Sequence, residues 1–197
     1  MKNNKKPTRG KGLLENFLAK KRSKRANFLI PKELRKGRIL DIGCGSYPYF
    51  LITTSFEEKF GIDPSIKNLN DERIILKRTK VDNRKLPFKD EFFDAVTMLA
   101  VIEHIEFNKL PQILGEINRV LKIGGILILT TPAPWADTLL HFMGKVGLIS
   151  AEEINEHKHN HQRLGIEKIL EEAGFKRQKI RSGFFELFAN MWFVAEK

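Results

Sequence analysis

The sequence predicts an α/β fold in which a doubly wound, mostly parallel sheet is covered by helices on both faces. One observation predicts this fold class, and two others indicate a single domain without disulfide bonds. Short apolar runs that end in glycine, aspartate or proline alternate along the chain with segments of helical period. At 197 residues, with 42% hydrophobic and 30% charged residues, the chain has the size and balance of a single globular domain. Its one cysteine excludes a disulfide framework and fits a reducing, cytoplasmic environment.

Most of the positive charge lies at the beginning of the chain. The net charge is +11, yet residues 1–25 carry ten Lys and Arg against one acid, whereas residues 26–197 carry 25 against 23. We therefore divide the chain into a basic N-terminal arm with the start of a first helix, 1–25, and a nearly neutral domain, 26–197. A helix over 13–30 that packs its apolar stripe on the domain is predicted by the spacing of Leu13, Leu14, Phe17 and Leu18. Contact of the arm with nucleic acid or an anionic surface is the other open interpretation.

Seven strands follow after Pro31. Arg38–Ile42 is a short apolar run that ends at Gly43, as a buried parallel strand does. The later strands are predicted at Lys59–Ile62, Thr79–Val81, Phe92–Leu99 and Ile126–Thr130, with two closing strands between Phe175 and Val194. Apolar residues at a helical period predict helices at Lys109–Leu121 and Ile166–Ala173.

A segment between the fifth strand and the last helix, residues 132–161, is predicted to form a lid-like insertion. It is rich in large apolar residues, which suit a cover over a partly hydrophobic acceptor, although plain core packing explains the same residues. The longest apolar region of the chain, 124–149, is broken by prolines and charged residues. We therefore expect no transmembrane segment, no signal peptide and a cytoplasmic location.

Glycines follow the first strand, at the edge of the sheet where ligands of doubly wound folds bind. Gly43 and Gly45 lack a Cβ, so the backbone there can approach a ligand closely. A dinucleotide site requires a third glycine, but Pro48 holds that place. Asp41 would also repel a pyrophosphate. An acid at this position instead suits a ligand that carries positive charge.

A series of motifs runs through residues 25–197 in a fixed order. They are Asp41–Ser46, Phe60–Asp63, Asp82 with Leu86–Phe88, Phe92–Val96, Val101–Ile105, Glu116–Gly125 and Leu170–Phe175. Together they resemble the motifs of the class I S-adenosylmethionine-dependent methyltransferases, in their small type 11 branch. The resemblance implies a Rossmann-like sheet of seven strands, S-adenosyl-L-methionine as cofactor, and methyl transfer as activity.

The resemblance also implies roles for the residues around the first strand. Asp41 would lie under the methionine end of the cofactor, where its charge offsets the amine and the sulfonium. The loop of Gly43, Cys44 and Gly45 would close on the cofactor with its backbone.

Other strand ends supply the rest of the implied cofactor site. Asp63 resembles the acid that accepts both ribose hydroxyls, because a carboxylate accepts two O–H donors; the alternative is a plain Asx turn before a proline. Asp82 resembles the acid that accepts from the adenine amine, with the backbone of Asn83 nearby; its alternative is another strand-end turn. Leu99 and Ala100, at the end of the fourth strand, would supply backbone contacts to the methionine portion.

Two histidines are candidates for the chemistry. His104 follows the fourth strand, and an imidazole exchanges protons near neutral pH, so it suits a general base; a hydrogen-bonded histidine that braces the cofactor loop is the equal alternative. His161 has the spacing of an acceptor-pocket histidine before the last helix in the family that these motifs resemble. His157, His159 and His161 alternate, but no cysteine or acidic cluster completes a ligand set, so we expect no metal.

The acceptor is narrowed by what the sequence lacks. Enzymes that methylate base amines carry an Asn/Asp-Pro-Pro-aromatic turn after the fourth strand, and here the residues are Met98–Val101. A pyrimidine C5 enzyme needs a nucleophilic cysteine, and the sole thiol lies in the cofactor loop. We expect a small or medium-sized acceptor with an O or N atom, such as a sugar, a glycan or a lipid-linked compound. The alternatives are an RNA methyltransferase that uses the basic arm, and a cofactor-binding protein without transfer activity.

Overall fold

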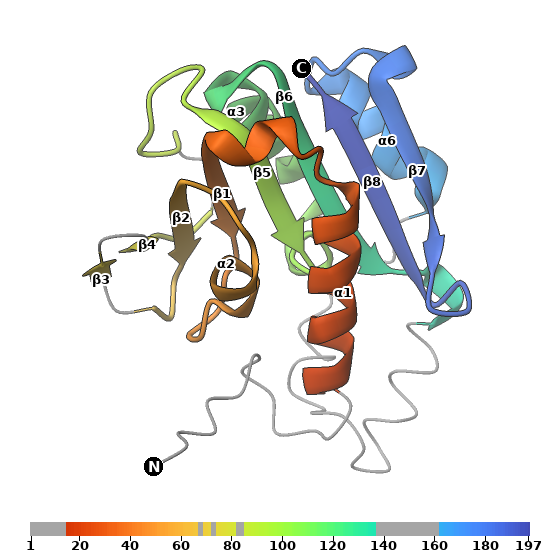
Figure 1. Cartoon of the computed structure of the whole chain (residues 1–197). Coiled ribbons are helices and arrows are strands. Elements are labelled where there is room, and N and C mark those ends of the chain that lie inside the picture. The colour runs from red at the N-terminus through yellow and green to blue at the C-terminus, as the bar shows by residue number, and fades with distance from the viewer. Residues whose placement is uncertain (1–14, 67–68, 72–73, 82–84, 137–161) are drawn as a thin grey trace.

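One sheet forms the centre of the protein. The computed structural model describes residues 15–66, 69–71, 74–81, 85–136 and 162–197 (Figure 1). The strands are β1 (Arg38–Ile42), β2 (Glu58–Asp63), β3 (Leu69–Asp71), β4 (Ile74–Arg78), β5 (Phe93–Leu99), β6 (Leu121–Pro132), β7 (Ile180–Phe185) and β8 (Asn190–Glu196). They form one eight-stranded sheet in the order β3-β4-β2-β1-β5-β6-β8-β7.

The chain winds outward from β1 in both directions. β1 pairs in parallel with β2 on one side and with β5 on the other, and β4 and β6 continue the parallel ladder. β8 is antiparallel to both β6 and β7. The predicted doubly wound sheet of seven strands is thereby confirmed. A short eighth strand, β3, is added at the edge, antiparallel to β4.

The third strand of the prediction lies earlier in the chain than expected. It was expected at Thr79–Val81, but β4 uses the preceding apolar run, whose residues Ile74 to Arg78 pair with Lys59 to Asp63. The ladder ends just beyond it, where the N–H of Thr79 donates to the carbonyl of Asp63 at 3.3 Å. The run was overlooked because charged residues flank it closely on both sides. β6 is also longer than predicted at both ends.

Helices cover both faces of the sheet. Helices α1 (Glu15–Leu29) and α2 (Tyr49–Thr53) lie on the face seen in front in Figure 1, and α3 (Leu110–Val120) and α6 (Arg163–Glu172) lie behind it. Alternate residues of β1 therefore enter two separate apolar clusters. Ile39 packs with residues of α1 and α2, whereas Leu40 and Ile42 pack with residues of α3 and α6. The helices predicted at Lys109–Leu121 and Ile166–Ala173 are confirmed as α3 and α6.

Within the described part of the predicted apolar stripe, Leu18 is half-buried and Phe17 is not packed on the domain. Phe17 is 52% exposed, and the residues of α1 and its end that are buried are Ser23, Ala26 and Ile30. These three are spaced for one helix face, and the small side chains of Ser23 and Ala26 let the helix approach the sheet closely. Leu13 and Leu14 lie outside the described residues.

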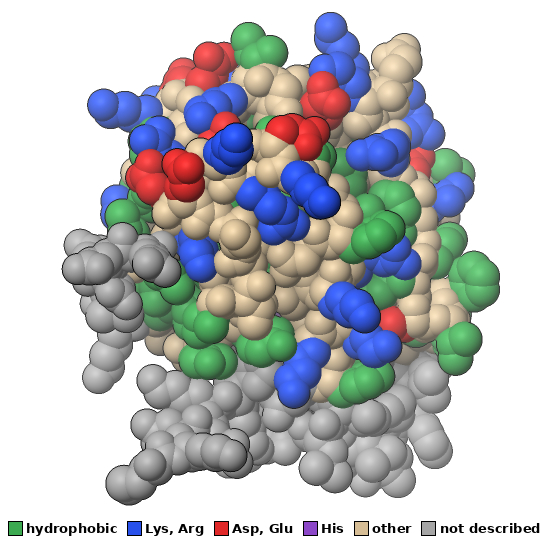
Figure 2. Space-filling view, viewed as in Figure 1, with side chains coloured by type: hydrophobic (Ala, Val, Ile, Leu, Met, Phe, Trp, Pro, Cys, Tyr) green, Lys and Arg blue, Asp and Glu red, His purple; other side chains and the backbone are tan. Residues whose placement is uncertain are grey.

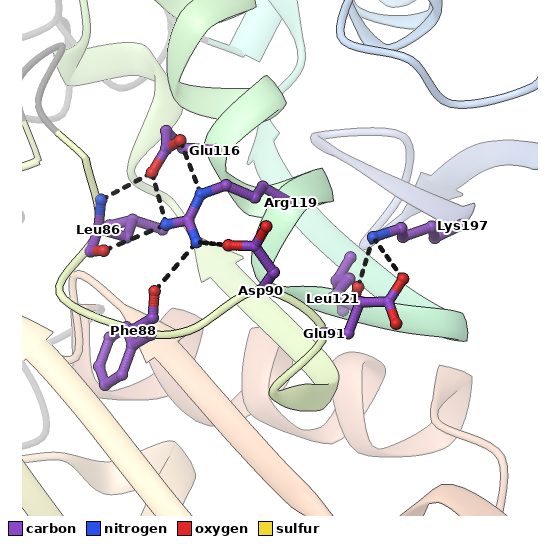
Figure 3. Close-up of polar contacts among 8 residues, drawn as sticks. All are labelled: Leu86, Phe88, Asp90, Glu91, Glu116, Arg119, Leu121 and Lys197. Atoms are coloured by element: carbon purple, nitrogen blue, oxygen red, sulfur yellow. Dashed lines mark hydrogen bonds and ion pairs between the residues drawn. The ribbon is translucent and has the colours of Figure 1, made fainter.

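One arginine holds the segment that precedes β5, as Figure 3 shows. Arg119 of α3 donates two hydrogen bonds to the Glu116 carboxylate, at 2.9 and 2.8 Å. It also donates to the carbonyls of Leu86 and Phe88 and to Asp90, so that all its N–H donors are used. Glu116 accepts in turn from the backbone N–H of Leu86 at 2.8 Å. The motif residues Glu116 and Arg119 thus form a structural clamp.

No helix in the described part of the chain combines the length and the apolar character needed to cross a membrane.

Candidate functional site

The loop after β1 depends on its glycines. Gly43 and Gly45 have φ angles of 75° and 72°, which side chains other than glycine rarely adopt. The N–H groups of Gly43 and Cys44 both point to the carbonyl of Ile62, at 2.8 and 3.4 Å. A Cβ on Gly43 would lie 2.4 Å from the Val101 side chain, whereas a Cβ on Gly45 would meet only the carbonyl of Tyr47, at 3.9 Å. The backbone at Gly45 therefore borders open space.

Asp63, at the end of β2, ties this loop to the next strand. Its side chain is buried, and one carboxylate oxygen accepts from the N–H of Gly45 at 3.0 Å. The other oxygen accepts from the N–H of Ser65 at 2.8 Å and from the Ser65 hydroxyl. The bond to the N–H two residues ahead is an Asx turn, so this alternative from the sequence is present. The carboxylate also fixes the glycine loop, which the sequence did not predict.

Asp41 lies in β1, directly before the loop, and is buried. The Thr97 hydroxyl of the adjacent strand β5 donates to it at 2.7 Å. Burial raises the pKa of Asp41 to about 7, the Thr97 hydrogen bond opposes this rise, and the nearby Asp63 charge adds to it. The carboxyl can therefore change its charge near neutral pH, and a positively charged ligand beside it would favour the ionised form.

Thr97 was not among the residues predicted for the site. A signal for it does exist in the sequence, because a threonine within the apolar run Phe93–Leu99 must find a partner for its hydroxyl once the strand is buried. Strand register then decides the partner, since Thr97 stands beside Asp41 in the sheet.

The segment after β5 lies against the glycine loop. Leu99 ends the strand, and Ala100 follows with a φ of 58° while its N–H donates to the carbonyl of Thr130 at 2.9 Å. His104 ends a short 3-10 turn, Ile102–His104, and is half-buried. Glu103 in the same turn is buried, and its Oε2 atom has no hydrogen-bond partner in the described part of the chain. This third buried acid of the site was not predicted.

Several predicted residues lie outside the described ranges. They are Asp82, Asn83, His157, His159 and His161, together with residues 137–161 of the predicted lid. The structure thus brings Asp41, the glycine loop, Asp63 and the turn of His104 to one edge of the sheet. Within the residues described, no three His, Cys, Asp or Glu side chains gather in a way that would hold a metal ion.

The buried Asp41 makes the stability of the ligand-free protein depend on pH. Its pKa is 3.8 in the unfolded reference and about 7 in the folded protein, so its contribution is complete below pH 4 and is lost as the pH rises through 7. We expect the free energy of unfolding to fall by up to roughly 4 kcal/mol over this range, at about 1.4 kcal/mol per pKa unit. Urea unfolding across pH should show this fall in the wild type and a much smaller one in Asp41→Asn. An equal slope in both proteins would refute the assignment.

Comparison with known proteins identifies the family. Residues 14–179 match the family described as methyltransferase domain. The chain is 34% identical over 154 residues to an uncharacterised protein of Methanocaldococcus jannaschii, covering 75% of this chain and 58% of that protein's length. It is 30% identical over 154 residues to a protein of Encephalitozoon cuniculi that is named as a methyltransferase, covering 72% and 71% of the two chains.

Solved structures agree with this family. A SAM-dependent methyltransferase from Archaeoglobus fulgidus superposes with a TM-score of 0.66 at 17% identity, covering 93% of this chain and 94% of that one. An S-adenosylmethionine-dependent methyltransferase from Mesorhizobium loti gives 0.69 at 17% identity, covering 91% and 100%. At this identity the likeness shows a common fold. The family match establishes that the chain belongs to the methyltransferase-domain family, and the chain has the fold of S-adenosylmethionine-dependent methyltransferases, as its motifs predict.

Proposed function

We propose that this chain moves a methyl group from S-adenosyl-L-methionine to an O or N atom of a small or medium-sized acceptor. The observation that carries the proposal is the joining of the glycine loop to Asp63 at 3.0 Å, directly beyond the buried Asp41. A buried carboxyl that titrates near neutral pH fits a cationic ligand, and the open backbone at Gly45 fits a close approach. The residues present therefore suit the family's cofactor.

The proposed cofactor contacts follow from the strand ends. Asp41 in its ionised form offsets positive charge at the methionine end, and the backbone of Gly43, Cys44 and Gly45 packs beside it. Asp63 accepts from the ribose hydroxyls, and the Ser65 hydroxyl donates to the same carboxylate. Four further residues complete the proposed set: Asp82 and Asn83 at the adenine, and Leu99 and Ala100 at the methionine portion.

The cofactor supplies a methyl group on a positively charged sulfur, so the protein mainly has to orient the acceptor and remove its proton. We assign the removal of the acceptor's proton to His104, because His104 follows β5 at the same sheet edge as the glycine loop. In this proposal residues 26–197 form the catalytic domain, and the acceptor, a sugar, glycan or lipid-linked compound, lies beneath residues 132–161.

The test is a transfer reaction with the purified full-length chain. The protein is incubated with methyl-labelled S-adenosyl-L-methionine and a fractionated cell extract, and the label is followed by mass. We expect a gain of one methyl in the small-molecule fraction. Label that appears only in RNA would instead support the RNA alternative, which the basic residues of the arm favour. Cofactor binding without any transfer to any fraction would refute the enzymatic proposal.

Substitutions of Asp63 test the ribose contact. Asp63→Ala should weaken binding of the cofactor or its demethylated product by roughly 1.5–3 kcal/mol, a typical loss for hydrogen bonds to a charged group. Asp63→Asn, which keeps one acceptor oxygen, should fall between this variant and the wild type. Ser65→Ala serves as the control, because it removes only the hydroxyl bond and leaves the Gly45 bond in place. Calorimetry should rank the four proteins in this way. Unchanged affinity in Asp63→Ala would exclude the contact.

A further inference from the structure

A hollow of about 410 Å³ lies between α1, the 3-10 turn Glu33–Lys36, and α2. We refer to it as the α1–α2 hollow. Its lining includes Lys20, Ser23 and Lys24 of α1, Arg35 of the turn, and Tyr49 and Thr53 of α2. None of these residues belongs to the proposed cofactor contacts or to the proposed base. The function of the hollow is therefore a separate question from methyl transfer.

The floor of the hollow is a fixed network of polar groups. Arg35 donates to the side-chain oxygen of Asn27 and to the Thr54 hydroxyl, both at 3.3 Å, and to the carbonyl of Asn27 at 2.7 Å. The Thr54 hydroxyl donates to Asn27 at 2.7 Å. These bonds connect α1, the turn and the end of α2, so the walls are held in place without a ligand.

The charge of Arg35 is not balanced by an acid. Every hydrogen bond that it makes within the described residues goes to a neutral oxygen, including the carbonyl of Ser55 at 3.4 Å. No aspartate or glutamate is among the described residues that line the hollow. The guanidinium therefore keeps its positive charge at the wall of the hollow.

Two lysines add to this charge from the rim. Lys20 and Lys24 are four residues apart on α1, are exposed, and make no hydrogen bond or ion pair with any residue that the structure describes. Like charges at this spacing disfavour a helix, so their pairing over one hollow has a cost that an anion would offset. Figure 2 shows Lys and Arg side chains gathered where α1 runs in Figure 1.

We propose that the α1–α2 hollow binds the phosphate group of a phosphorylated small molecule. Three cationic residues and Tyr49 line the same hollow, and phosphate oxygens accept strong, charge-assisted hydrogen bonds from donors of this kind. The volume lies in the usual range for small-molecule sites, about 300–1,000 Å³. Donors that converge on a single hollow suit a compact anion, whereas a nucleic-acid strand is held by charges that follow a groove.

The test uses the full-length chain and two probes, inorganic phosphate and glycerol 3-phosphate, titrated at constant ionic strength by calorimetry. We expect saturable binding of both, weakened about tenfold or more in Lys20→Gln/Lys24→Gln. Glutamine is a good helix former, so the double variant should fold, and its thermal unfolding verifies this. The matched control is Lys32→Gln/Lys36→Gln, which removes two exposed lysines of the adjacent turn that do not line the hollow. It should retain the wild-type affinity.

Three outcomes would overturn the proposal. Neither probe binds the wild type, or both double variants lose affinity equally, which would indicate a general effect of net charge. Alternatively, an oligoribonucleotide or vesicles of phosphatidic acid bind through Lys20 and Lys24 while glycerol 3-phosphate does not, which would make the face a polyanion or membrane surface. Cofactor affinity, measured in the same samples, should not differ between the variants. A failure of methyl transfer would leave these binding results unchanged.

Discussion

His104→Ala should lower turnover on the true acceptor by roughly 10²–10⁴-fold, the usual contribution of a positioned general base. Cofactor affinity should stay nearly unchanged, because His104 is not among the proposed cofactor contacts, of which Leu99 and Ala100 are the ones at the end of β5. The physical reason is placement: His104 ends the turn after β5, at the edge where the glycine loop and Asp63 meet. Single-turnover rates together with calorimetry on the same preparation separate the two effects.

A matched control keeps this result specific to the imidazole. Asn108→Ala alters an exposed residue of the next 3-10 turn, Phe107–Lys109, and should retain the wild-type rate. If His104→Ala also turns over at the wild-type rate, His104 is not the base and His161 becomes the next candidate. If both histidines prove dispensable, orientation of the acceptor alone accounts for transfer to the sulfonium methyl.

Arg119→Met should destabilise the fold by roughly 2–4 kcal/mol, the loss expected when a fully used guanidinium leaves its partners unsatisfied. The carbonyls of Leu86 and Phe88 and the Glu116 carboxylate would each lose a donor. The segment would also be released from the aromatic cluster, in which the Phe88 ring meets the Phe93 ring edge-on at 4.8 Å. Urea unfolding at neutral pH measures the change.

Arg163→Met provides the comparison for a surface arginine. Arg163 pairs with Glu167 at 3.9 Å and is 44% exposed, so its loss should cost about 0–1 kcal/mol.

The stability that the Arg119 clamp contributes should also depend on pH. The Arg119 hydrogen bond lowers the pKa of Glu116, so the stability gained from this pair is present at neutral pH and is lost as the pH falls below the ordinary range of a glutamate. Equal losses in the two arginine variants would refute the clamp.

The order of strands and helices could be predicted because it depends on local patterns. Apolar runs that stop at Gly43, at Asp63-Pro64 and at Pro132 mark strand ends, and the helical period of α3 is clear over three turns. The packed face of α1 could not be predicted in the same way. The large residue Phe17 is mostly exposed, whereas Ser23 is buried with its hydroxyl 3.2 Å from the Thr53 hydroxyl of α2, a contact between distant segments that no local pattern encodes.

The same distinction between local patterns and long-range contacts applies to the candidate site. Asp41, Gly43, Gly45 and Asp63 could be identified because each stands beside a strand end that the sequence marks. The partners of these residues could not, since they depend on how strands align. Thr97 meets Asp41 across a parallel pair of strands that are 56 residues apart, and the near-neutral pKa follows from a depth of burial that no local pattern encodes. Glu103 escaped notice for the same reason.

The position of β8 in the sheet has a consequence for how the protein is made. β8 lies between β6 and β7, and its neighbours on both sides precede it in the chain. While residues 190–196 are still inside the ribosome, β6 has an open edge and β7 has no strand to join. Until residues 190–196 have been made, the backbone N–H and C=O groups along this edge of β6 are unpaired and open to association with other strands. The sheet is thus completed only by a strand that is made after both of its neighbours, however early the first strands assemble.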